Sequence, residues 1–221
     1  MTGNLQPAAT TPRSAIEIVP VGLRVEGKAV LVVGAGRIAA RKADAYASQG
    51  AIVTVVAPQH SPEMDAVDAA ERHHRAFRAS DLDGQWLVVT ATGRPEVDGE
   101  VYAEAETCRI WCNAADDPEH CSVILPAVVR RDGITIAISS GGRSPATASW
   151  LRRRIERLLD HDTLAVFAIA AGVRDRMRAN GQPTEVAGWN EVLDNDALPL
   201  VAAGEHDELA RRLATAVGVP T

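Results

Sequence analysis

The segment Gly34-Ala35-Gly36-Arg37-Ile38-Ala39 is the part of the sequence whose residue types and spacing point most directly to chemistry. It fits the G-x-G-x-x-A fingerprint, in which Gly34 permits a tight turn and Gly36 lets the backbone approach a pyrophosphate. The phosphates would meet the N-terminus of the following helix, where free N–H groups and the helix dipole favour negative charge. The segment follows an apolar run and opens a helical pattern, so it predicts dinucleotide binding. The alternative is a tight strand–helix turn without a ligand.

The second apolar run ends differently from the usual dinucleotide pattern. An acidic side chain about twenty residues after the glycines commonly holds the ribose 2′-hydroxyl. Here the run ends in Ala57-Pro58-Gln59, which contains no carboxylate. No arginine follows at once to favour a 2′-phosphate. The residues alone therefore leave NAD and NADP open.

A carboxylate at position 116 is a candidate for acid–base chemistry. Asp116 follows an expected strand end at Asn113, and ligands bind at the carboxyl edge of sheets of this kind. A carboxylate there can accept a proton while a hydride leaves to a nicotinamide. The alternative is a turn-forming aspartate within Asp116-Asp117-Pro118. We expect Asp117 to be the structural turn residue.

A third candidate site precedes a predicted helix. The residues Ser140, Gly141, Gly142 and Arg143 combine exposed backbone N–H groups with one positive charge, which suits a carboxylate ligand. Ser144 as the N-cap and Pro145 in the first helical position indicate a plain helix start as well.

The cysteines and histidines do not form a convincing metal site. Cys108, Cys112 and Cys121 are an odd, small number, which favours reduced thiols in a cytosolic protein. We expect Cys112 to be a buried small hydrophobe rather than part of a metal clip. His120 is the histidine nearest the candidate site, and no metal ligand is predicted. The tryptophans are expected in the core.

The order of predicted elements indicates the fold that positions these residues. Strands are expected over residues 28–33, 52–56, 75–78, 86–91 and 109–112, and helices over residues 37–49, 62–72 and 96–107. This alternation predicts an α/β, Rossmann-like, doubly wound parallel sheet. Strands at 122–124 and 133–139, joined by a turn at 130–133, form a hairpin-like segment. Helices follow from Ser144, over residues 163–180, 185–193 and 205–217.

These elements divide the chain into four parts. We expect a disordered leader at residues 1–18, a dinucleotide-binding Rossmann domain at 19–121, a small β-containing segment at 122–145 and a C-terminal helical domain at 146–221. The leader does not have the pattern of a signal peptide.

Composition excludes several classes of protein. The 221 residues are 46% hydrophobic and 24% charged, which is typical of a soluble globular protein. A formal net charge of -6 argues against a nucleic-acid partner. No apolar stretch approaches the roughly 20 residues of a membrane span, so we expect a cytoplasmic protein without a membrane segment.

Several segments together resemble the precorrin-2 dehydrogenase/sirohydrochlorin ferrochelatase family. They are residues 19–21, 34–42, 53–58, 87–92, 113–118, 126–131 and 138–145, within a similar region of roughly residues 19–160. The most specific piece is Ser139-Ser140-Gly141-Gly142-Arg143-Ser144-Pro145. The chain departs from the family at Thr92-Gly93-Arg94, where Thr-Asp-Asp is usual, and at Asp98, where an asparagine is usual.

The resemblance implies an enzyme that oxidises precorrin-2 to sirohydrochlorin with NAD in siroheme biosynthesis. It implies cofactor contacts at Arg37, Ile38, Pro58 and Gln59, and we add Gly34, Gly36 and Thr92 to them. It places the acid–base carboxylate at Asp116, and we assign Asn113 and residues 140–143 to the tetrapyrrole. Some members insert ferrous iron or are phosphorylated at the position of Ser140, and the central segment commonly forms a homodimer. The alternatives are a chelatase without dehydrogenase activity and a non-enzymatic NAD-sensing regulatory module.

Overall fold

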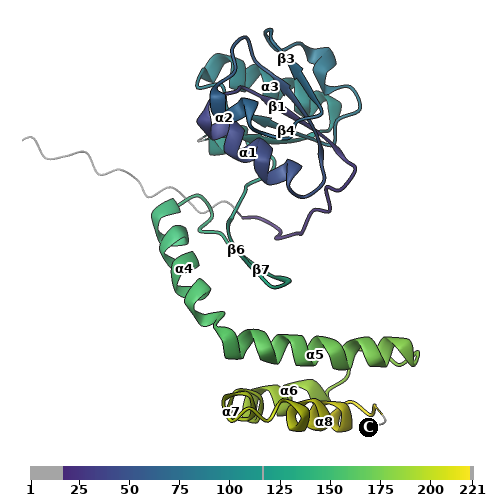
Figure 1. Cartoon of the computed structure of the whole chain (residues 1–221). Coiled ribbons are helices and arrows are strands. Elements are labelled where there is room, and N and C mark those ends of the chain that lie inside the picture. Colours follow the sequence, from purple (N-terminus) through teal and green to yellow (C-terminus); the bar gives the residue numbers. More distant parts are fainter. Residues whose placement is uncertain (1–16, 116, 220–221) are drawn as a thin grey trace, which may run out of the picture. The chain divides into compact units, whose positions relative to one another are not determined.

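The computed structural model describes residues 17–115 and 117–219, which form two units (Figure 1). One unit ends at Leu125 and the other begins at Pro126. The predicted leader lies largely outside the described residues, as does Asp116. None of the helices within the described ranges is long and apolar enough to cross a membrane.

The first unit is built on a five-stranded parallel sheet of order β3-β2-β1-β4-β5, which confirms the predicted fold class. Its strands are β1 (Ala29–Val33), β2 (Ile52–Val56), β3 (Glu71–His73), β4 (Leu87–Thr90) and β5 (Trp111–Ala114). Its helices are α1 (Arg37–Ala47), α2 (Pro62–Asp65) and α3 (Pro95–Cys108), with 3-10 turns at Ala79–Leu82 and Pro118–His120.

Both faces of this sheet are buried. Alternate residues of β1 point to opposite faces: Val30 and Val32 pack with α1, and Leu31 and Val33 pack with α3. A parallel strand buried on both faces reads as a continuous apolar run, which is why the sequence revealed it. The two helices therefore lie on opposite sides of the sheet (Figure 1).

Four strands end at the same level. Val33 of β1 is in register with Val56 of β2 and with Thr90 of β4, and Thr90 is in register with Ala114 of β5. The residues that follow these strands therefore meet at one carboxyl edge, where ligands bind in sheets of this type.

Three elements predicted for residues 17–125 are wrong. The helix expected over residues 62–72 ends at Asp65, and Glu71–His73 is an edge strand that pairs with β2. Residues 75–78 are not a strand, because the Arg75 guanidinium bonds the Asp81 carboxylate and shapes a loop there. Residues 122–124 are not a strand either. An isolated bridge joins Cys121 to Asn113, and the Ser122 and Val123 amides both donate to the Cys112 carbonyl.

The second unit begins with the antiparallel hairpin of β6 (Ala127–Arg131) and β7 (Ile134–Ile138). Its turn is Asp132-Gly133, shorter than the turn predicted over residues 130–133, and both residues have positive φ. Such a pair of dihedrals matches the right-handed twist of the flanking strands.

Five helices complete the second unit. They are α4 (Pro145–Leu158), α5 (His161–Ala179), α6 (Gly188–Asn195), α7 (Ala197–Ala202) and α8 (His206–Ala216). Ser144 caps α4 by accepting a hydrogen bond from Thr147 N, as predicted. The side chains of Val173, Met177, Leu209 and Leu213 are fully buried in one helical core. Helix α7 was not predicted.

The expectation that the tryptophans lie in the core is wrong for three of them. Trp86, Trp111 and Trp150 are 60%, 56% and 48% exposed. Trp86 directly precedes β4, and Trp111 is the first residue of β5.

Candidate dinucleotide site and the adjacent polar cluster

The turn after β1 accepts only glycine at its first position. Gly34 has a φ of 107°, and a Cβ there would lie 2.5 Å from the carbonyl oxygen of Ala91. Its amide donates to the carbonyl of Val56 at 2.9 Å, and the Ala91 amide donates to the carbonyl of Val33 at 2.9 Å. The loops after β1, β2 and β4 are thus tied together at the sheet edge.

The second glycine faces open space. A Cβ on Gly36 would meet no atom within 4 Å. Gly36 is the N-cap of α1, yet no side chain caps this helix and its first turn contains no acidic residue. The first N–H groups of α1 are consequently not satisfied by a cap, which is the arrangement that binds phosphate at a helix N-terminus. Arg37 and Ile38 are exposed beside it.

The loop after β2 borders the same turn. Pro58 and Gln59 are exposed, and two residues later the Ser61 amide donates to the carbonyl of Ala35 at 3.0 Å. The structure thus brings the predicted cofactor residues of the first two loops to one edge of the sheet.

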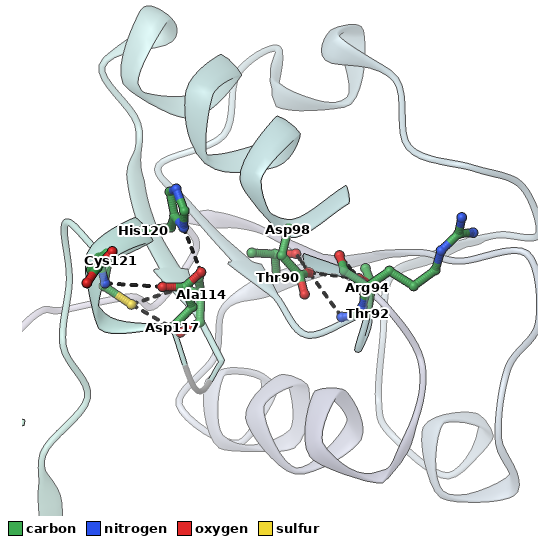
Figure 2. A network of polar contacts seen from close by, with 9 residues as sticks. Thr90, Thr92, Arg94, Asp98, Ala114, Asp117, His120 and Cys121 are labelled. Atoms are coloured by element: carbon green, nitrogen blue, oxygen red, sulfur yellow. Dashed lines mark hydrogen bonds and ion pairs between the residues drawn. The ribbon is translucent and has the colours of Figure 1, made fainter. Parts of the chain in front are cut away.

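A buried carboxylate holds the loop after β4 (Figure 2). Oδ1 of Asp98 accepts hydrogen bonds from the hydroxyls of Thr90 and Thr92, the latter at 2.8 Å, and from the Thr92 amide at 3.2 Å. Thr92 Oγ1 in turn accepts a hydrogen bond from the Arg94 amide at 3.1 Å. Asp98, which departs from the family pattern, therefore fixes the residue predicted to contact the cofactor.

A second polar cluster surrounds the end of β5. Asn113 is 4% exposed, and its amide donates to the carbonyl of Val123 at 2.7 Å. Its Oδ1 accepts from Lys42 Nζ of α1 at 2.6 Å. Cys121 lies beside it, with its thiol bonded to the backbone of Ala114, and burial raises the pKa of this thiol. Sequence reasoning assigned Lys42 no role, although it lies five residues beyond Arg37 on the same helix.

Next to this cluster, an aspartate and a histidine pair (Figure 2). His120 Nδ1 lies 2.6 Å from Asp117 Oδ2, and this hydrogen bond lowers the pKa of the Asp117 carboxyl. Asp117 also accepts from the Glu119 amide at 3.2 Å, as a turn residue does. The predicted catalytic residue Asp116 directly precedes this pair but lies outside the described residues.

The predicted substrate residues 140–143 belong to the second unit. Three amides of this turn are bonded within it: Gly141 donates to Ser139 Oγ, Arg143 to the Ser140 carbonyl and Ser144 to Ser140 Oγ. The backbone cradle expected from the sequence is thus largely used by the turn itself. The exposed Arg143 guanidinium remains as the group suited to a carboxylate.

The remaining cysteines do not form a metal clip. Cys112 is fully buried, as predicted, and burial raises its pKa to about 12. Cys108 is exposed, and both thiols are free. Within residues 17–115 and 117–219, no three potential metal ligands converge.

The sheet and its glycine loop define a Rossmann-type dinucleotide-binding protein, and comparison with known proteins narrows the class. Residues 21–127 match the family described as "Putative NAD(P)-binding", and residues 131–158 match "Sirohaem biosynthesis protein central". Over residues 21–158 the chain is therefore similar to proteins of sirohaem biosynthesis that contain this pair of domains.

Curated relatives are similar to the chain in sequence, and one solved structure is similar to it in fold. The chain is 37% identical over 204 residues to "Siroheme synthase 3" of Aeromonas hydrophila, covering 90% of this chain and 44% of the relative. It is 36% identical over 206 residues to "Siroheme synthase 1" of Aeromonas salmonicida, with the same coverage. The chain therefore spans less than half the length of these relatives. The solved structure of "SirC, precorrin-2 dehydrogenase" has the same fold, with a TM-score of 0.68 at 22% identity, covering 90% of this chain and 100% of that one.

Proposed function

We propose that this chain is an NAD-dependent precorrin-2 dehydrogenase that forms sirohydrochlorin in siroheme biosynthesis. One observation carries the proposal: a glycine loop opening an uncapped helix lies in a chain that also contains the sirohaem central segment. The oxidation removes a hydride and a proton from the macrocycle. Bound NAD would supply the hydride acceptor.

Residues of the first unit are proposed to bind the cofactor. Gly34 and Gly36 admit the pyrophosphate to the start of α1, because position 34 has no room for a side chain and position 36 is open. Arg37, Ile38, Pro58, Gln59 and Thr92 complete the cofactor site. Thr92 is held in place by Asp98.

Other residues are proposed to accept the proton and to bind the tetrapyrrole. By its place after β5, Asp116 is proposed as the proton acceptor, with Asn113 beside it on the substrate side. Arg143 of the second unit is proposed to bind a substrate carboxylate, and Ser140, Gly141 and Gly142 to shape its turn. Iron insertion as a second activity, a homodimer and a cytoplasmic location belong to the same proposal.

The decisive measurement is the absorbance at 340 nm after precorrin-2 and NAD are mixed with the chain. Asp116→Ala should still bind NAD but lower the rate of NADH formation by ~100-fold, since a positioned acid–base group contributes on that order. Asp117→Asn is the matched control, because an asparagine keeps the turn bond to the Glu119 amide.

Two outcomes would contradict the proposal. Unchanged rates in Asp116→Ala would remove this carboxylate from the reaction. Ferrous iron insertion without any NADH would favour a chelatase, and a chain that binds NAD but no tetrapyrrole would favour a regulatory module.

A further inference from the structure

The first turn of α2, which follows the loop after β2, contains a carboxylate at Glu63, later than the position at the end of β2 where dinucleotide-binding folds usually have one. β2 ends at Val56, and residues 57–59 contain no acid. The chain then folds back on the glycine loop through the bond from Ser61 N to the Ala35 carbonyl, which brings Glu63 beside the start of α1. Glu63 is thus the first acidic residue after β2 on the side where the adenosine half of a dinucleotide would lie.

Glu63 shares a cavity with two arginines of α1. The cavity, of about 400 Å³, lies between α1 and α2 and is lined by Arg37, Arg41, Asp44 and Glu63 among others. Arg37 directly follows Gly36, and Glu63 comes two residues after the bond that joins Ser61 to Ala35. These two lining residues therefore adjoin the segments that form the glycine loop and its contact with Ser61, and their opposite charges interact.

Local contacts keep the Glu63 carboxylate ionised. Its pKa is lowered first by its own backbone N–H, next by the Ser61 hydroxyl, and also by the Arg37 guanidinium. Ser61 is itself fixed, because its hydroxyl accepts the Met64 amide at the start of α2. A carboxylate held in this way accepts hydrogen bonds from ribose hydroxyls and repels a phosphate.

We propose that Glu63 is the specificity-determining residue for the adenosine half of the dinucleotide, accepting the ribose 2′-hydroxyl of NAD and excluding the 2′-phosphate of NADP. The inference rests on the proposed function of the glycine loop. Arg37 has the opposite tendency, because a guanidinium attracts a 2′-phosphate, and the Glu63 carboxylate offsets it.

The test is direct binding of NAD⁺ and NADP⁺ to the full chain by isothermal titration calorimetry, which needs no tetrapyrrole. Glu63→Gln keeps the side chain's size and removes its charge. It should weaken NAD⁺ by ~5-fold and tighten NADP⁺ by ~10-fold, since a charged acceptor is lost and a repulsion is relieved. Adding Arg37→Ala to Glu63→Gln should abolish the gain for NADP⁺.

Asp44→Asn is the matched control. Asp44 lines the same cavity but lies seven residues after Arg37, about 10 Å further along α1. The same loss of charge there should leave the NAD⁺/NADP⁺ ratio unchanged. An equal change of ratio in Asp44→Asn and Glu63→Gln would show a general field effect and overturn the assignment.

The failure of this inference is distinguishable from the failure of the proposed function. A wild-type chain that binds neither dinucleotide would overturn both. A wild-type chain that binds NAD⁺, with an unchanged preference in a folded Glu63→Gln variant, would overturn only the role of Glu63.

Discussion

Asp98 shows how one buried carboxylate shapes the cofactor edge of this protein. It is 7% exposed, and the donors to it are the side chain of Thr90 and the side chain and amide of Thr92. Burial of such a group is tolerated only when hydrogen bonds replace its hydration. The loop after β4 also contains Ala91, whose carbonyl oxygen leaves no room for a side chain at Gly34. Asp98 therefore acts on the glycine loop through two intervening residues and is a positioning residue.

Replacing Asp98 should reveal this role. Asp98→Ala removes the acceptor of the buried Thr90 hydroxyl and of the half-buried Thr92 hydroxyl, and it should lower the free energy of unfolding by about 2 kcal/mol. Asp98→Asn keeps the Oδ1 acceptor and should cost less than half of that. Urea denaturation measures both, and NAD⁺ titration should show weaker binding for the alanine variant. Equal stability of Asp98→Ala and the wild type would contradict this account.

At the scale of elements, the sequence predicted what local patterns determine. The sequences of β1, β2 and β4 are continuous apolar runs because both faces of the sheet are buried. The glycine spacing predicts the turn between β1 and α1. Strand β3 was not predicted, because residues 66–73 have no strong strand pattern. Glu71–His73 is extended because it pairs with β2. Pairing across the fold overrides weak local propensity.

The candidate site was predictable to a similar extent. Its motif residues follow strands and could be placed on one edge in advance. The contact between Lys42 and Asn113 joins residues 71 positions apart, so no local sequence pattern predicts it. The same holds for Glu63, because the bond from Ser61 N to the Ala35 carbonyl that brings it beside α1 joins residues distant in the sequence.

Helix α5 offers a test of how a cap stabilises an element. Oδ1 of Asp160 accepts the Thr163 amide at 2.9 Å, and this bond is the largest cause of the lowered pKa of Asp160. A carboxyl with a lowered folded-state pKa stabilises the fold above its unfolded pKa of about 3.9, and this stabilisation is lost as the pH falls through the folded value.

Asp160→Asn separates the charge of this cap from its hydrogen bond. Asparagine caps helices about as well as aspartate but has no charge to interact with the helix dipole. We expect the wild type to be more stable than Asp160→Asn at pH 7. The difference should shrink below about pH 4, where the unfolded chain begins to bind a proton at Asp160, and vanish once the pH falls below the lowered folded-state pKa. Urea midpoints between pH 3 and 7 measure it, and a difference independent of pH would contradict the role of the charge.

At the scale of the whole molecule, each of the two units has hydrophobic packing of its own among the described residues. The sheet unit buries residues such as Val32, Val53 and Val88 on its two faces, whereas the second unit buries Leu209 and Leu213 among its helices. Every cofactor residue proposed here lies in the first of these units. A dinucleotide should therefore stabilise one core and leave the other unaffected.

Scanning calorimetry with and without NAD⁺ tests this division. We expect two transitions, and NAD⁺ at 100 times its Kd should stabilise only the sheet unit, by about 2.7 kcal/mol. Leu209→Ala identifies the helical transition, because it removes a fully buried side chain from that core alone. Gly36→Val should abolish the effect of NAD⁺ while the variant stays folded, since a Cβ at this position meets no protein atom within 4 Å and the backbone there is extended. Its own transition temperature should fall slightly, because valine is a poorer N-cap than glycine. If both transitions rose together on adding NAD⁺, the two units would unfold as one cooperative body and the division would be wrong.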